Sequence, residues 1–122
     1  MQCFPYPSVL LWLPSGMLYS ELESYLLNQN IRLIRVASAD SGKTLSYLLG
    51  LESARFGIPE QLPEEPVLVL FGLNGVATDQ LLAFLRSHRP IALKASVTQA
   101  NLKWTFAHLA KELAKEHKQL NQ

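Results

Sequence analysis

The residues that most resemble a chemical site form the segment Ala-Ser-Ala-Asp-Ser-Gly-Lys-Thr at positions 37–44. Gly42, Lys43 and Thr44 match the end of the phosphate-binding pattern G-x-x-x-x-G-K-S/T, in which backbone N–H groups and the lysine hold phosphates. Ala37 stands where the pattern has its first glycine. The segment lies between an expected strand and an expected helix, which is the context that the pattern requires.

Two features weigh against a nucleotide site in this segment. Such a site needs an acidic residue at a neighbouring strand end to hold magnesium, and the expected strand at 67–71 ends in Gly72. The helix that follows the segment is only about two turns long before Gly50, which makes a weak scaffold. We therefore rank nucleotide binding as the least favoured function. The simpler alternative is that Asp40 or Ser41 caps a helix and that the lysine lies in solvent.

A second candidate site comes from polar residues around the ends of the expected strands. Ligands of parallel sheets bind beyond the carboxyl ends of the strands, and we expect four loops, including 96–101, to meet at one edge. The residues that we predict to hold a small anionic ligand there are Lys94, Thr98, Asn101, Ser15 and Asn74. The same residue types form caps and turns, and this structural alternative is favoured.

Lys94 has two interpretations that depend on where its strand lies. An unpaired lysine buried in a central strand would be costly and would indicate catalysis or anion binding. On an edge strand, a lysine commonly prevents pairing with other chains. We favour the second interpretation.

Trp104 and His108 lie one turn apart on a predicted helix, away from its apolar stripe. A tryptophan in this position either folds against the preceding turn or contacts a partner. Because aromatic residues are enriched in buried interface cores, a homodimer contact is one of two balanced alternatives. His108 has no cysteine, aspartate or second histidine at metal spacing, so we predict no metal site. No Ser/His/Asp grouping follows from the spacing, and we predict no catalytic residue and no cofactor.

The elements that must position these residues alternate along the chain. Apolar runs predict strands at 9–13, 31–36, 67–71 and 91–97, and helices follow each of them. Asn28 and Asn30 are expected to end the first helix, and Thr78 is expected to begin the third. The core stripes expected on the first and last helices are Leu18, Leu22, Tyr25 and Leu26, and Leu102, Phe106, Leu109 and Leu113.

This alternation predicts an α/β fold with a four-stranded, mainly parallel sheet and helices on both faces. We predict the strand order 2-1-3-4, because the first and third strands are the most apolar. Residues 1–122 are expected to form one domain, with a connecting loop at 52–66 and a frayed tail from about 115 to 122.

Composition limits the classes of partner. Eleven basic and ten acidic residues give a net charge of +1, so no field directs the chain to nucleic acid or to an anionic membrane. No apolar run is long enough to span a bilayer. Cys3 is the only cysteine, which excludes an internal disulfide. We expect a cytoplasmic protein.

Three blocks of sequence resemble a known family. They are TLSYLLGL (44–51), VLVLFGL (67–73) and LKASVTQANLKWTFAHL (93–109). The last block is similar to the pattern L-K-A-x-L-T-x-x-N-x-x-W-T of the bacterial domain-of-unknown-function family three-seven-eight-three. The resemblance implies no activity, cofactor or catalytic residue, because none is established for that family.

The sequence therefore favours a small binding or regulatory module that acts through its C-terminal strand, turn and helix as a homodimer, and that is not an enzyme. The alternative is an enzyme or a binder of a small anionic metabolite in the crevice at the strand ends.

Overall fold

The computed structural model describes residues 7–51 and 57–120 of the chain. Cys3 and the first five residues of the predicted connecting loop lie outside this part. The four strands form one sheet in the order β2-β1-β3-β4, which confirms the predicted order and the α/β class. The strands are β1 (Ser8–Trp12), β2 (Arg32–Arg35), β3 (Val67–Phe71) and β4 (Leu93–Ser96).

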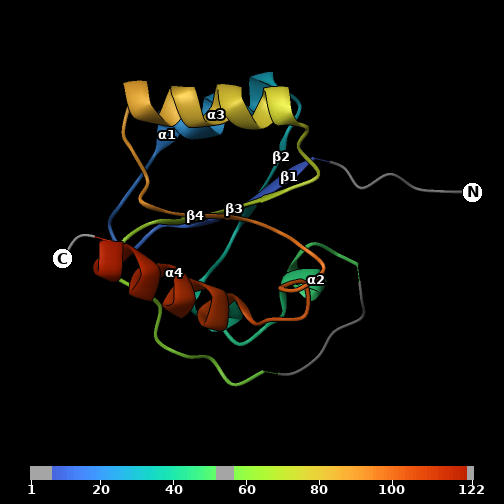
Figure 1. The fold of residues 1–122 in the computed structure, drawn as a ribbon, viewed down its shortest axis with the longest axis vertical. Coiled ribbons are helices and arrows are strands. Elements are labelled where there is room, and N and C mark those ends of the chain that lie inside the picture. The colour runs from blue at the N-terminus through green and yellow to red at the C-terminus, as the bar shows by residue number, and fades with distance from the viewer. Residues whose placement is uncertain (1–6, 52–56, 121–122) are drawn as a thin grey trace, which may run out of the picture.

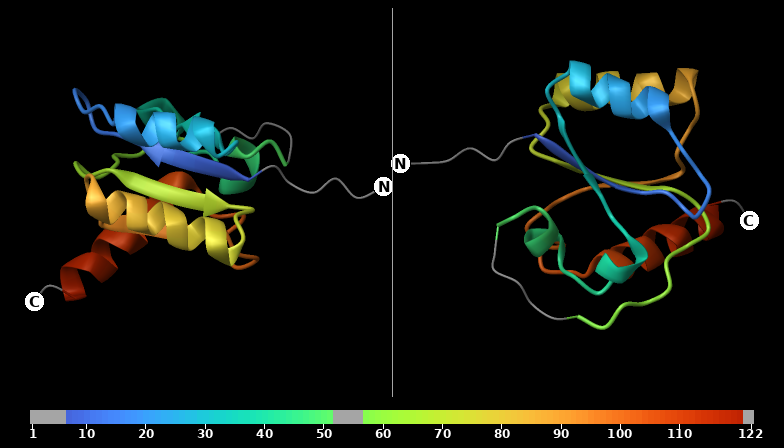
Figure 2. Two further views of the ribbon diagram at one scale, coloured as in Figure 1. Left: turned by 90° about the horizontal axis from the view of Figure 1, so that it is seen from above. Right: turned by 180° about the vertical axis from the view of Figure 1, so that it is seen from behind.

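The two central strands run in opposite directions (Figure 2). β1 is parallel to β2 and β3 is parallel to β4, but β1 and β3 pair antiparallel, with Leu10 opposite Val69. The sheet is therefore mainly parallel, as predicted. The expectation that the carboxyl ends of all four strands lie at the same end of the sheet is wrong. The carboxyl ends of β1 and β2 lie at one end of the sheet, and those of β3 and β4 lie at the other.

Helices cover both faces of the sheet, as predicted (Figure 1). Alternate strand residues point to opposite faces, so Val9 and Leu11 pack with one helix layer whereas Leu10 packs with the other. The first layer contains α1 (Ser20–Asn28) and α3 (Gly75–Ser87). The second contains α2 (Leu45–Leu48) and α4 (Phe106–Leu120).

The reversal of β3 follows from the path of residues 57–66. A helix that crosses the sheet once would return the chain to start a parallel strand. Here the described part of the connection runs back beneath α4 (Figure 1), where Leu62 is buried in the core. At the end of β1, the Trp12 indole donates to the Pro63 carbonyl (2.9 Å). The chain thus passes the same face a second time and enters β3 in the opposite direction.

The first helix begins later than the sequence suggests. α1 starts at Ser20, and Leu18 is 69% exposed, so the prediction that it belongs to the core stripe is wrong. Tyr19 takes its place at 1% exposed, where its hydroxyl donates to the Arg89 carbonyl (2.6 Å). Asn30 has φ 57°, which confirms the predicted left-handed end of the helix.

Two other helix starts also differ from the prediction. α3 is capped by Asn74, whose side chain accepts from the Ala77 N–H, rather than by Thr78. Leu102 lies in a turn before α4 and is half-buried. α4 itself continues to residue 120, through most of the tail that was predicted to fray. Within the described residues, no helix combines the length and the apolar character needed to cross a membrane.

Candidate functional site

The crevice predicted from four loops does not form, because the antiparallel pairing of β1 and β3 separates the loops into two sets. Trp12 at the end of β1 lies opposite Val67 at the start of β3. Ser15, which follows β1, therefore lies beyond one end of the strands, and Asn74, which follows β3, lies beyond the other. The length of a five-residue strand, on the order of 14 Å, separates these two ends of the sheet.

Thr98 and Asn101 are brought together, but by bonds to each other. The Thr98 N–H donates to Asn101 Oδ1 (2.8 Å), and the Asn101 N–H donates to Thr98 Oγ1 (3.2 Å). Asn101 Nδ2 donates to the Ser96 carbonyl (3.1 Å) at the end of β4. Asn101 is only 8% exposed. This Thr98–Asn101 turn uses both polar atoms of the asparagine side chain to connect β4 to the chain that follows.

Lys94 lies on the edge strand β4 and is exposed. Its ammonium group donates to the Ile91 carbonyl at the start of the same segment. The side chain is on the face opposite to that of Leu93, which is buried in the core. These observations fit the edge-guard interpretation of Lys94 rather than a buried catalytic lysine.

The turn before α4 pairs with the segment before α2. The Leu45 N–H donates to the Trp104 carbonyl (2.9 Å), and the Phe106 N–H donates to the Lys43 carbonyl (2.9 Å). These bonds form an isolated antiparallel bridge between the two segments. The start of α4 is therefore bonded to the backbone of the segment before α2, and the chain turn that precedes α4 is held against α2.

Trp104 is half-buried in this turn and packs against the core beneath it. His108, which is exposed, contacts its ring edge-on, with 4.4 Å between ring centroids and an interplanar angle of 88°. The two predicted interface residues therefore form one contact, with one part of the tryptophan in the core and another part at the surface.

The segment that resembles a phosphate loop is filled by the protein itself. Ser41 is fully buried, and its hydroxyl accepts from the Glu60 N–H (2.7 Å). A Cβ atom added to Gly42 would collide with the backbone of Ile58. The glycine is therefore required for close contact between two backbone segments. No room is left above it for a phosphate.

Lys43 in this segment is paired with Asp40 (2.9 Å). Burial acts to raise the pKa of Asp40, but hydrogen bonds from Lys43 and from the Ala37 N–H outweigh it and lower the pKa from its ordinary value. The hydrogen bond with Asp40 raises the pKa of Lys43. Lys43 is thus held within the loop by Asp40, which is one of the two residues expected to cap a helix.

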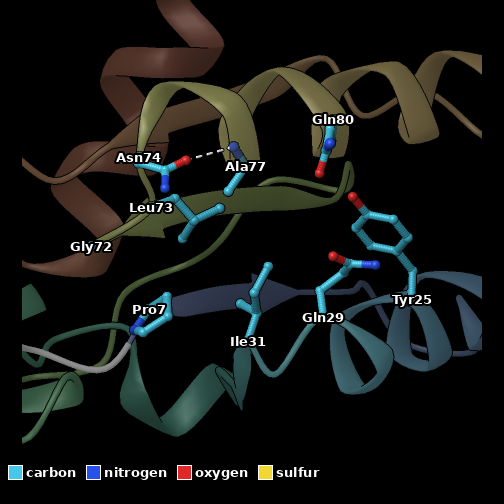
Figure 3. Close-up of a pocket in the computed structure, with 9 residues that line it drawn as sticks. All are labelled: Pro7, Tyr25, Gln29, Ile31, Gly72, Leu73, Asn74, Ala77 and Gln80. Atoms are coloured by element: carbon cyan, nitrogen blue, oxygen red, sulfur yellow. Dashed lines mark hydrogen bonds between the residues drawn. The ribbon is translucent and has the colours of Figure 1, made fainter.

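Asn74 is the predicted ligand residue that lines a pocket beyond the end of β3 (Figure 3). The pocket has a volume of about 120 Å³ and lies between α1, α3 and the residues just before β1 and β2, Pro7 and Ile31. Sequence reasoning missed Tyr25, Gln29 and Gln80 in its wall. The four-residue spacing of Tyr25 and Gln29 places them on one helix side. Their proximity to Gln80 depends on how α1 packs beside α3, which no local pattern shows.

Ser15 lines a separate hollow of about 300 Å³ beyond the ends of β1 and β2. Arg35 also lines this hollow, and its guanidinium pairs with Glu23 (2.6 Å) on α1. This hollow therefore combines the hydroxyl of Ser15 with the guanidinium of Arg35, which is already paired with Glu23. Among the described residues, no group of histidine, cysteine, aspartate or glutamate side chains is arranged to hold a metal ion.

Comparison with known proteins supports the resemblance found in the sequence. Residues 66–120 match the model of a family described as Domain of unknown function (DUF3783). The match extends from the start of β3 through α4 and includes the Thr98–Asn101 turn, whereas block 44–51 lies outside it. Neither the curated proteins nor the solved structures contain a match to the chain.

Proposed function

We propose that the chain is a binding module of the cytoplasm that forms a homodimer through its C-terminal strand, turn and helix. Trp104 and His108 lie at the centre of the proposed contact. The observation that carries the proposal is the edge-on packing of Trp104 against His108 at the surface. The cytoplasmic location is supported by the presence of a single cysteine in the whole chain.

The rigidity of the turn supports this choice of surface. Contacts that are already ordered in the monomer reduce the conformational entropy lost on association. The Trp104 backbone bonds to α2, and its ring packs against the core. A tryptophan fixed in this way is suited to the centre of an interface, where large aromatic side chains contribute most of the binding free energy.

A homodimer also suits the chemistry of this surface. In a two-fold contact the same patch faces itself, so a patch dominated by like charges would repel its copy. Trp104 carries no charge and can meet its own copy without that penalty, and the His108 ring lies against it. Lys103 and Lys111 are exposed beside them, and Lys111 is paired with Glu60 (2.6 Å).

The test is the mass in solution over a range of protein concentrations. The wild-type chain should approach twice its 13.7 kDa mass, and His108→Glu should remain monomeric because two carboxylates would face each other across the symmetry axis. Gln119→Glu makes the same change in charge on an exposed residue near the far end of α4 and should still form the dimer.

Two results would contradict the proposal. One is a wild-type chain that stays monomeric at every concentration, and the other is a His108→Glu chain that dimerises as well as Gln119→Glu. Trp104→Ala is a second variant, but its ring also packs against the core, so its fold must be checked by circular dichroism.

A second candidate function is the binding of a small anionic metabolite beyond the ends of β1 and β2. The hollow that Ser15 and Arg35 both line favours it. An anion there would have to compete with Glu23 for the guanidinium. Inorganic phosphate should then raise the melting temperature of the wild-type chain but not that of Arg35→Gln. Equal shifts in both proteins would rule out this site.

A further inference from the structure

The pocket beyond β3 lies on the sheet face covered by α1 and α3, whereas Trp104 packs with the layer of α4 (Figures 1 and 3). We propose that this pocket binds an uncharged small molecule that carries a carboxamide group. The site is separate from the proposed dimer contact, and neither proposal depends on the other.

The lining of the pocket favours an uncharged ligand over a charged one. Every described residue in its wall is neutral, with apolar side chains such as Ile31 and Leu73 and polar ones that end in amides or a phenol. An ion that enters such a site loses hydration without gaining a charged partner, which is costly. The anion that the sequence suggested at Asn74 is therefore disfavoured here. A neutral polar group fits instead.

Asn74 supplies a hydrogen-bond donor with a fixed direction. Its Oδ1 atom accepts from the Ala77 N–H (2.8 Å), which determines which end of the amide is oxygen. Nδ2 therefore points away from α3 and into the space enclosed by the lining residues (Figure 3). A donor held in this way is suited to the carbonyl oxygen of a ligand.

Tyr25 supplies a second polar group in a fixed position. Its ring stacks on Phe84 (4.4 Å between centroids), and Phe84 stacks on His88 (4.0 Å). In this position the Tyr25 hydroxyl points toward Gln80, and the Gln29 amide lies on the other side of the same ring (Figure 3). A phenol and two amides can donate and accept, so they match the N–H and carbonyl groups of a carboxamide.

These three side chains are free to contact a ligand. Within the described part of the chain, Tyr25, Gln29 and Gln80 make no side-chain hydrogen bond to the protein. The pocket volume of about 120 Å³ is well above the ~10–15 Å³ that a single water molecule needs. It can therefore hold a small amide but not a folded peptide. A neighbouring hollow shares these three side chains and continues past Phe84, so a longer ligand could extend there.

The experiment is a titration followed by nuclear magnetic resonance of the ¹⁵N-labelled full chain. Propionamide and propionate are the probes, because they have the same shape and differ in charge. Propionamide should cause saturable shifts in the signals of Asn74, Ala77 and Gln80. Propionate should bind at least about tenfold more weakly, since its charge finds no partner in the pocket.

Two variants identify the pocket groups that bind. Asn74→Asp keeps an oxygen for the Ala77 N–H, so α3 remains capped, but it replaces the Nδ2 donor with a charged acceptor. It should weaken propionamide binding about tenfold or more. Tyr25→Phe keeps the aromatic stack and should weaken binding by a smaller factor. Gln61→Glu changes the charge equally at an exposed position outside this pocket and should bind as the wild type does.

Three outcomes would overturn the assignment. They are the absence of shifts with propionamide up to its solubility limit, equal affinity for both probes, and unchanged propionamide affinity in Asn74→Asp. The His108→Glu variant should bind propionamide normally even if dimerisation is lost. A failure of the dimer proposal is therefore distinguishable from a failure of this one.

Discussion

Replacing Asn101 with alanine tests whether the turn after β4 is a structural connection or part of a ligand site. The substitution removes the bond from the Thr98 N–H to Oδ1 (2.8 Å) and the bond from Nδ2 to the Ser96 carbonyl (3.1 Å). Each such bond contributes about 0.5–1.5 kcal/mol net, and an unsatisfied buried partner costs about 1–3 kcal/mol. Asn101 is 8% exposed, so little water can replace its side chain. The free energy of unfolding should fall by about 2.5 kcal/mol.

This loss should be visible in both chemical and thermal unfolding. The unfolding entropy of globular proteins is about 2.1 cal/mol/K per residue. For 122 residues, a loss of about 2.5 kcal/mol therefore lowers Tm by about 10 °C. Urea unfolding followed by circular dichroism measures the free energy directly, and a thermal scan of the same protein measures Tm.

Two variants in the same turn serve as controls for Asn101→Ala. Gln99→Ala also replaces an amide with alanine, but at an exposed position, and should change stability by less than about 0.5 kcal/mol. Thr98→Ala removes only the 3.2 Å bond from the Asn101 N–H and should cost about 1 kcal/mol. The structural account is refuted if Asn101→Ala is as stable as Gln99→Ala, because the asparagine side chain would then be free for a ligand.

Three further changes test other parts of the structure. Gly42→Ala should destabilise the fold by about 1–3 kcal/mol in urea, because its Cβ would collide with the Ile58 backbone; wild-type stability would contradict the close contact. The lowered pKa of Asp40 adds stability above pH 3.8, and this stability is lost as the pH falls through the pKa of Asp40 in the folded state. The raised pKa of Lys43 adds stability below pH 10.5, and this stability is lost as the pH rises through the pKa of Lys43 in the folded state. Asp40→Asn should therefore flatten both limbs of a plot of unfolding free energy against pH, and unchanged limbs would count against the pair. Lys94→Thr should leave stability within about 0.5 kcal/mol but increase light scattering on heating, whereas equal scattering would argue against its role as an edge guard.

The sequence was sufficient for the strand order but not for strand direction. The apolar runs of β1 and β3 identified them as central, and the charged residues of β2 and β4 placed these strands at the edges. The alternation of strands and helices suggested a parallel sheet throughout. The direction of β3 depends on residues 57–66, whose bonds and burial beneath α4 involve partners far away in sequence.

The candidate site was only partly predictable for a related reason. Asn74 and the pair formed by Trp104 and His108 could be selected because their residue types and local spacing carry information. Asn101 was selected for the same polar character, but its amide is used within its own turn. Tyr25 and Gln80 lie 55 positions apart, and only the packing of α1 beside α3 brings them to one pocket.

The antiparallel contact between β1 and β3 gives the sheet an approximate two-fold axis perpendicular to its plane. Rotation about this axis exchanges β1 with β3 and β2 with β4, and it exchanges α1 with α3 in the same layer. The segment 66–120 that matches the family model contains one whole β-α-β half with its following helix. Taken alone, this half would expose the backbone edge of β3. Any polypeptide that presents a matching antiparallel strand, including a second copy of the same half, could complete the sheet in place of residues 8–35.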